Sequence, residues 1–316
     1  MFSQRVTNVI QTAILLLALV ALLLALGWFF AGIYGVLWAI FIGVIPLFVS
    51  LRMFPTLVLK MYGACPLDSS DVPLLAALVE ELGTRAGLVL PPRLYYITSK
   101  TALVFSTGWG NRSSIAVTGG LLGLLSLREL AGVLAHEISH IRNKDTWVMS
   151  FADMVSRVTG ILSFLGQLLI IVNLPLIILK YHSLPWIPLL LMLFAPVFSA
   201  LLQLALSRTR EFSADLDAAG ISGDPAGLAA ALAKLETYQT SLLKVGPFRM
   251  RKRMGPALLR THPLTEERIQ RLRLLEEEMD RRGNDRHPTK NGHLTLPGHL
   301  AKEAKSPRRH AGGLWY

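Results

Sequence analysis

The sequence predicts an α+β membrane protein that is mainly helical, with a small β-sheet and two transmembrane helical hairpins. Three kinds of segment lead to this prediction: long apolar runs without charge, short strand-like runs, and helices with one apolar face. The 316 residues are 52% hydrophobic and only 17% charged, whereas soluble domains are normally less apolar and more charged. We therefore expect membrane-spanning segments together with a folded part outside the bilayer.

The first apolar run covers residues 9–51 and is almost free of charge. A single helix of this length would measure about 64 Å, roughly twice the thickness of the bilayer core. A hairpin of two spans that turns near Gly27–Gly32 fits the bilayer better. The alternative is a cleaved signal peptide. However, the apolar part is too long, no clear small-residue cleavage site follows it, and a second span comes at once.

A folded part is expected after Lys60. Residues 71–87 carry apolar side chains at helical spacing and predict a capped helix. Residues 93–98, 103–106 and 114–118 predict the short strands of a small sheet. An exposed edge of this sheet could bind an unfolded polypeptide by strand addition, which favours a peptide over a small molecule as the bound molecule.

The most informative pattern in the chain is His136-Glu137-x-x-His140. Ser126 and Glu129 form a capping box that predicts the start of its helix. Residues four apart lie on one helix face, so both imidazoles could bind one Zn²⁺ while Glu137 takes a proton from water. The alternatives are two surface histidines, or two hydrogen-bonded histidines in a core helix. Apolar residues before the motif indicate a buried helix, where unpaired histidines would be costly.

A second pair of apolar runs, 161–179 and 184–206, follows the motif and predicts the second hairpin. Each run is long enough to span a bilayer. Polar side chains and prolines interrupt both runs and make them weaker candidates than the first pair, namely Gln167, Asn173, Gln203, Pro185, Pro188 and Pro196. A hairpin that is buried, or that dips into one leaflet, is therefore the alternative.

A zinc peptidase needs a third protein ligand, and Glu211 is the best candidate. It lies in residues 208–219, which predict a helix ended by Gly220. Asp215 follows one turn later on the same face, where it could accept the other N–H of a zinc-bound histidine. The alternative is an ordinary solvated face of charged residues, and only the pairing with the upstream motif favours a metal site.

The two motifs together resemble those of the HtpX-type membrane zinc metallopeptidases, relatives of the CAAX prenyl proteases. The resemblance covers about residues 1–275 and includes the segment Thr261-His262-Pro263-Leu264-Thr265-Glu266-Glu267-Arg268-Ile269. Shorter similarities lie at 106–108 and 117–122. The resemblance implies a gluzincin-like zincin protease domain that binds one Zn²⁺ per chain.

The resemblance also implies roles for two residues late in the chain. His262 would lie near the metal and either support a metal ligand or stabilise the oxyanion, although a histidine at a helix start before proline is the alternative. Arg268 would pair with an acidic residue near the site. One departure concerns the family pattern N-A-F-A-T-G, because Leu103 stands here in place of the asparagine. The substrate contact of that asparagine is therefore not implied for this chain.

Charge placement predicts the orientation in the membrane. Lysine and arginine flank the same ends of all apolar runs, at Arg5, Arg52, Lys60, Arg142, Lys144, Arg208 and Arg210. By the positive-inside rule, both termini and the metal site then face the cytoplasm of a multi-pass protein in the cell inner (cytoplasmic) membrane. The single cysteine, Cys65, permits no intramolecular disulfide, which suits a reducing compartment.

The chain has a net charge of +11, and basic residues cluster at 244–260. No nucleic-acid-binding motif accompanies them, so we expect contact with anionic lipid heads and no nucleic-acid partner. We expect an N-terminal transmembrane hairpin at 1–55 and a metallopeptidase domain at 56–280, interrupted by a second membrane hairpin at about 158–206. Residues 281–316 predict a basic, disordered tail.

The predicted function is a zinc metalloendopeptidase that cuts misfolded or damaged membrane proteins at the cytoplasmic face. The substrates and this quality-control role are implied by the resemblance alone. A processing peptidase for one peptide or lipidated substrate is the alternative within enzymes. A membrane scaffold with a structural zinc site is the alternative from another class, and such a site would be closed by a fourth protein ligand.

Overall fold

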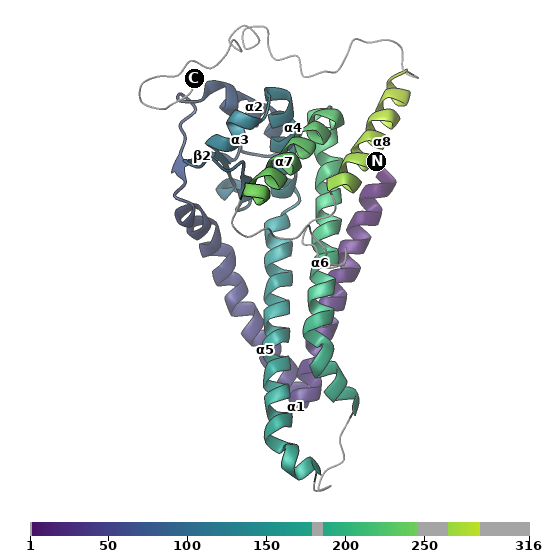
Figure 1. Cartoon of the computed structure of the whole chain (residues 1–316). Helices are drawn as coiled ribbons and strands as arrows, with labels where there is room; N and C mark the ends of the chain where they lie inside the picture. Colours follow the sequence, from purple (N-terminus) through teal and green to yellow (C-terminus); the bar gives the residue numbers. More distant parts are fainter. Residues whose placement is uncertain (1, 179–185, 246–264, 285–316) are drawn as a thin grey trace. The chain divides into compact units, whose positions relative to one another are not determined.

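The computed structural model describes residues 2–178, 186–245 and 265–284 (Figure 1). The helices are α1 (Phe2–Met61), α2 (Pro73–Arg85), α3 (Gly119–Leu124), α4 (Leu127–Arg142), α5 (Asp145–Ile178), α6 (Trp186–Ser222), α7 (Pro225–Val245) and α8 (Thr265–Asn284). The strands are β1 (Cys65–Pro66), β2 (Arg93–Ile97), β3 (Val104–Thr107) and β4 (Ser114–Thr118). The prediction of a mainly helical α+β chain with a small sheet is confirmed.

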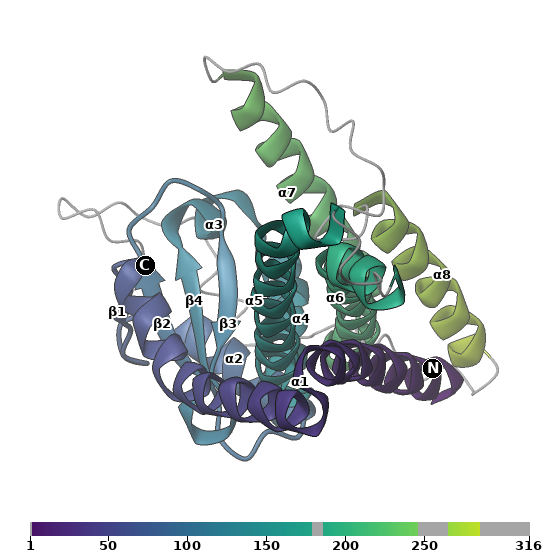
Figure 2. The same ribbon diagram turned by 90° about the horizontal axis from the view of Figure 1, so that it is seen from below.

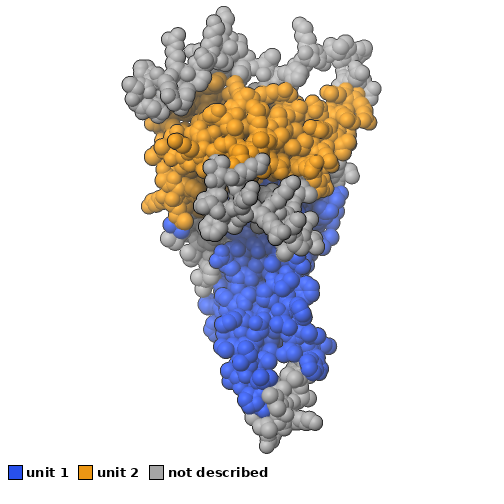
Figure 3. Space-filling view, viewed as in Figure 1, with its two compact units in different colours: residues 1–57, 145–213, 251–263 blue, residues 58–144, 214–250, 264–316 orange. Residues whose placement is uncertain are grey.

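The described chain divides into two compact units, coloured separately in Figure 3. Unit 1 comprises residues 2–57, 145–178 and 186–213. Unit 2 comprises residues 58–144, 214–245 and 265–284. Unit 1 holds most of the apolar helices, and unit 2 holds the sheet and the H-E-x-x-H helix.

In unit 1, α1 is two helices joined at a break. Ala31 (φ −150°, ψ 28°) and Gly32 (φ 58°, ψ −139°) leave the helical region, so the predicted turn near Gly27–Gly32 is confirmed. The two arms approach closely beside the turn. A Cβ on Gly35 would collide with the carbonyl oxygen of Gly27, which only glycine avoids.

Among the residues that the structure describes, three helical stretches are long and apolar enough to cross a membrane: Val6–Val44, Asp145–Val172 and Trp186–Ser222. Large apolar side chains cover their outer faces, among them Trp38, Phe164, Ile171 and Val197, each more than two fifths exposed. Exposed apolar surface of this extent fits a lipid environment better than water. The chain is therefore a membrane protein by composition, helix length and surface.

The helices α5 and α6 are joined inside unit 1 by polar contacts. Pro196 lies within α6 and has no N–H, so the carbonyl of Met192, four residues earlier, loses its helical partner. The Ser163 hydroxyl and the Gln167 amide of α5 both donate to that carbonyl. Gln167 and Pro196 both weakened the sequence prediction of this hairpin, and here Gln167, together with Ser163, satisfies the carbonyl that Pro196 leaves without a helical partner.

In unit 2 the sheet has the strand order β1-β2-β4-β3. β2 and β4 are parallel, and the two outer strands are antiparallel to their neighbours. Every residue of β4 is buried. Leu59, near the end of α1, packs with Ile97 and Ala116 on one face of the sheet. The helix α4 packs against α2 and against β3, whose place in the sheet is seen in Figure 2. The helix with the two histidines therefore lies beside an outer strand.

Candidate metal centre

The helix α4 begins at the predicted capping box. Ser126 Oγ accepts from the backbone N–H of Glu129, and Glu129 Oε2 accepts from the backbone N–H of Ser126 at 2.8 Å. Lys234 of α7 donates to the same carboxylate oxygen at 2.7 Å. Burial alone would raise the pKa of the Glu129 carboxyl, but the bonds from Lys234 and Ser126 outweigh burial and lower this pKa. The start of α4 is thus fixed to α7.

The two histidines of α4 turn their rings toward each other. Their Nε2 atoms are 3.1 Å apart, and the ring centroids are 4.6 Å apart in an edge-to-face arrangement. His136 is buried, while His140 and Glu137 are half-buried. Glu137 follows His136 by one residue and precedes His140 by three, so it lies on the neighbouring face of the same helix. The predicted alternative of two solvated surface histidines is therefore wrong.

The buried ion pair of Asp215 and Arg268 contacts His136 on the Nδ1 side of its ring. Asp215 Oδ1 lies 3.0 Å from Nδ1 of His136. Arg268 of α8 donates to both oxygens of Asp215, from Nε and Nη2, at 2.7 Å each. A proton on Nδ1 that is donated to Asp215 leaves the Nε2 lone pair of His136 facing His140. This tautomer is the one that a metal ligand requires.

The third predicted ligand completes a donor set of two imidazoles and one carboxylate. His136, His140 and Glu211 each offer one ligand atom, and these atoms all lie within 4.8 Å of one another. Nitrogen and oxygen donors of this kind suit zinc, and catalytic zinc sites commonly have three protein ligands. The residues present therefore fit a divalent metal ion.

The predicted site residues differ in how they are placed. His136, His140 and Glu211 form the donor group, and Asp215 with Arg268 supports His136. His262 lies outside the described residues. The prediction that Gly220 ends the helix of Glu211 is wrong, because α6 continues to Ser222 and Gly223 follows with φ 71°.

Two further residues of α4, which the sequence motifs did not indicate, also contact α6. Ser139 Oγ lies 3.2 Å from the carbonyl oxygen of Ala214, and Asn143 Nδ2 donates to Asp217 Oδ2 at 2.8 Å. Both residues follow a histidine of the motif by three positions. That spacing was the signal in the sequence, although it did not reveal their partners.

The start of β3 is held by Thr118, which is fully buried. Its hydroxyl caps α3 by accepting from Leu121, accepts from the backbone N–H of Leu103 at 2.9 Å, and lies 2.7 Å from the carbonyl of Thr101. Gly120 lets this loop come close, because a Cβ there would collide with the Lys100 carbonyl oxygen. Residues 117–122, one of the segments that resemble the metallopeptidase family, therefore anchor the outer strand β3.

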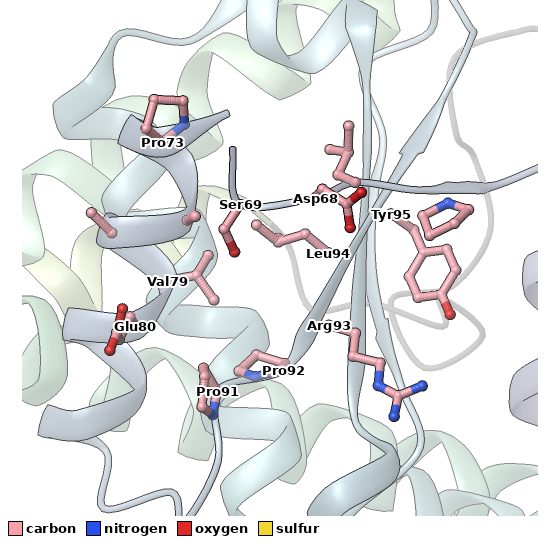
Figure 4. A pocket seen from close by; sticks show the side chains of 14 residues that line it. Asp68, Ser69, Pro73, Val79, Glu80, Pro91, Pro92, Arg93, Leu94 and Tyr95 are labelled. Carbon is pink, nitrogen blue, oxygen red and sulfur yellow. The ribbon is translucent and has the colours of Figure 1, made fainter. Parts of the chain in front are cut away.

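Unit 2 also contains a cavity of about 560 Å³ between α2 and β2 (Figure 4). Its lining includes Asp68, Glu80, Pro92 and Arg93, and none of the predicted site residues belongs to the described lining. The cavity is therefore separate from the donor group.

The family model and the similar proteins found by comparison agree on one peptidase family. The model of peptidase family M48 matches residues 70–276. A "Protease HtpX homolog" of Acidiphilium cryptum is 37% identical over 284 residues, covering 84% of this chain and 96% of the relative. The homologue of Paraburkholderia phytofirmans is 34% identical over 292 residues, with the same coverage.

Among solved structures, the crystal structure of S. mikatae Ste24p is similar, with a TM-score of 0.47 and 20% identity. The match covers 86% of this chain and 66% of that chain. This chain thus spans just under two thirds of the length of Ste24p.

Proposed function

The chain belongs to peptidase family M48, and on that premise we propose that it is an integral membrane zinc endopeptidase that cleaves misfolded or damaged membrane proteins at the cytoplasmic face. One observation carries the proposal. The ligand atoms of His136, His140 and Glu211 lie within 4.8 Å of one another, next to a glutamate in the H-E-x-x-H arrangement. The HtpX homologues support a protease, and the apolar helices support a membrane substrate.

In this proposal His136, His140 and Glu211 hold one zinc ion per chain. Bound zinc would polarise the scissile carbonyl and lower the pKa of water to about 7. Glu137 accepts the proton of the attacking water and later delivers it to the leaving amine. Its place on the face beside both histidines suits this role, because a general base must lie within hydrogen-bond reach of the proton it moves.

Asp215 and Arg268 prepare His136 for its role. Asp215 accepts from Nδ1 of His136 and so holds the tautomer and the orientation of the ring. The two bonds from Arg268 keep the carboxylate ionised and fix its direction. His262 is proposed to stabilise the oxyanion, on the strength of the segment it shares with the family.

The outer strand β3 supports a polypeptide substrate. The backbone N–H of Thr118 donates to the Leu103 carbonyl at 3.1 Å, so Leu103 directs its backbone toward β4. Along a strand of an antiparallel pair, residues whose backbone groups bond to the partner strand alternate with residues whose backbone groups point away from it. The N–H and C=O groups of Val104 and Ser106 therefore point to the side of β3 that has no strand within the described sheet. An extended peptide could add there beside α4.

The choice of an enzyme over a scaffold rests on the donor set. Among the residues that the structure describes, the group has three side chains, as in a catalytic zinc site that keeps a position open for water. A structural site would be closed by a fourth protein ligand. The proposed cytoplasmic orientation is supported by Arg142, Lys144, Arg208 and Arg210, which flank one end of the apolar runs.

The proposal is tested with the full chain purified in detergent. Zinc content, casein cleavage, loss of cleavage after chelation and its return with added zinc would be measured together. We expect about one zinc per chain and cleavage that depends on it. A chain that binds no zinc, or that cleaves equally well without metal, would contradict the proposal.

A further inference from the structure

The helix with the two histidines carries a second polar stripe beside them. Ser139 and Asn143 each follow a histidine by three positions, so the stripe lies about 60° around α4 from the metal-binding face. Ser139 is fully buried, and Asn143 is half-buried. None of the roles proposed above uses these two side chains.

Both side chains reach the segment of α6 that surrounds Asp215. The Ser139 hydroxyl shares its proton between the carbonyl of His136, at 2.6 Å in its own helix, and the carbonyl of Ala214, at 3.2 Å. Asn143 donates to Asp217 at 2.8 Å, three residues further along α6. Ala214 directly precedes Asp215, so the two contacts hold α6 on either side of the carboxylate that supports His136.

We propose that Ser139 and Asn143 are positioning residues, which hold residues 214–217 of α6 in the place where Asp215 meets His136. The inference rests on the proposed zinc site and extends it to two residues that touch neither metal nor substrate. A supported ligand must be held to within about 0.5 Å to work. Since Glu211 lies one turn before Asp215 on the same helix, a shift of this segment would disturb a ligand and its supporting carboxylate together.

The decisive measurement is metal binding by full-length Ser139→Ala and Asn143→Ala chains in detergent. Zinc affinity would be obtained by competition with a chromophoric chelator, and ligand geometry from the visible absorption of the cobalt-loaded protein. Ser222→Ala is the matched control, because Ser222 is equally buried and donates to the carbonyl of Ala218 within α6. We expect zinc affinity to fall about 10-fold in both test variants, with a changed cobalt spectrum.

A further variant separates the bond to Asp217 from its charge. Asp217→Asn keeps an oxygen that can accept from Asn143, so we expect it to retain zinc affinity better than Asn143→Ala does. The thermal unfolding of each metal-free variant reports any purely structural loss. If Ser139→Ala does not fold, Asn143→Ala decides the outcome, because its position is half-exposed.

Two results would overturn the inference, and they are distinguishable. Lower thermal stability with unchanged zinc affinity and cobalt spectrum would mean that the two residues only stabilise the fold, while the proposed function would stand. Absence of zinc binding by the unsubstituted chain would remove the proposed function and this inference with it.

Discussion

Nδ1 of His136 lies 3.0 Å from Oδ1 of Asp215, on a carboxylate that Arg268 grips with two hydrogen bonds of 2.7 Å. All three residues are less than one tenth exposed. A buried carboxylate between a cation and an imidazole is a strong orienting group, because its bonds are charge-assisted and shielded from water. The tautomer of His136 is therefore set by Asp215 and Arg268, which do not belong to the three-residue donor group.

Replacing Asp215 should weaken the site without abolishing it. Asp215→Asn keeps the shape but removes the charge that holds Arg268 and orders the Nδ1 proton. We expect zinc affinity or peptide cleavage to fall by about 10- to 100-fold. Asp153→Asn is the control, since that carboxylate makes an exposed ion pair with Arg157. Equal zinc affinity and cleavage in the Asp215→Asn and unsubstituted chains would rule out the orienting role.

The general base and the third ligand should fail in different ways. Glu137→Gln removes a proton acceptor but no metal ligand, so zinc should be retained while casein cleavage falls at least about 100-fold. Glu211→Ala removes a ligand, so zinc occupancy itself should fall. Metal content and cleavage would be measured on the same samples. Full cleavage by the Glu137→Gln chain would exclude the proposed mechanism, and normal zinc content in the Glu211→Ala chain would require another third ligand.

The ion pair that ties α4 to α7 should make stability depend on pH. The pKa of the Glu129 carboxyl is lowered in the folded chain, because the hydrogen bonds from Lys234 and Ser126 outweigh the burial that would raise it. Its contribution is therefore present above the unfolded pKa of about 4.3 and is lost as pH falls through the folded pKa. Glu129→Gln should be less stable than the unsubstituted chain near pH 7, and the difference should shrink below about pH 4.

Thermal unfolding between about pH 7 and about pH 3 measures this effect, because the range brackets the ionisation of a carboxyl group. Glu81→Gln serves as the control, because its partner Arg85 lies one turn away in an exposed pair. A constant difference between the Glu129→Gln and unsubstituted chains across this range would show that Glu129 contributes no pH-dependent stability.

The freed carbonyl of Met192 predicts a coupling between α5 and α6. Gln167→Leu removes one donor to that carbonyl and should lower the free energy of unfolding by about 0.5–1.5 kcal/mol. Pro196→Ala restores an N–H to α6, so the glutamine substitution should cost less in the Pro196→Ala background. A double-mutant cycle in detergent measures the coupling. Additive effects would mean that the proline and the glutamine act independently.

Labelling of single cysteines tests the orientation. In a Cys65→Ser background, Arg142→Cys and Thr209→Cys should resist a membrane-impermeant thiol reagent in intact cells, since basic residues surround both positions. Phe30→Cys and His182→Cys should react if both hairpins cross the bilayer. Reaction at position 30 alone would mean that the second hairpin only dips into the membrane. Labelling at position 142 from outside would overturn the cytoplasmic orientation.

Local physics explains what the sequence by itself determined. The spacing of His136 and His140 puts both rings on one face of any helix, and Ser126 with Glu129 marks where that helix begins. The length of the first apolar run requires a turn, and the break at Ala31 and Gly32 lies within the glycine-rich stretch. These features depend on neighbours a few residues apart, so they can be predicted before the fold is known.

Contacts between distant residues were decided only by the tertiary structure. Asp215 could be assigned to a histidine, but not to His136 in particular, and Arg268 was linked to an acidic residue only through the family resemblance. No sequence pattern indicated that Ser139 would meet the carbonyl of Ala214, or which side chains would donate to the carbonyl of Met192. The physical reason is that helical and strand periods specify which face a side chain occupies, whereas the partner on that face depends on how separate helices pack.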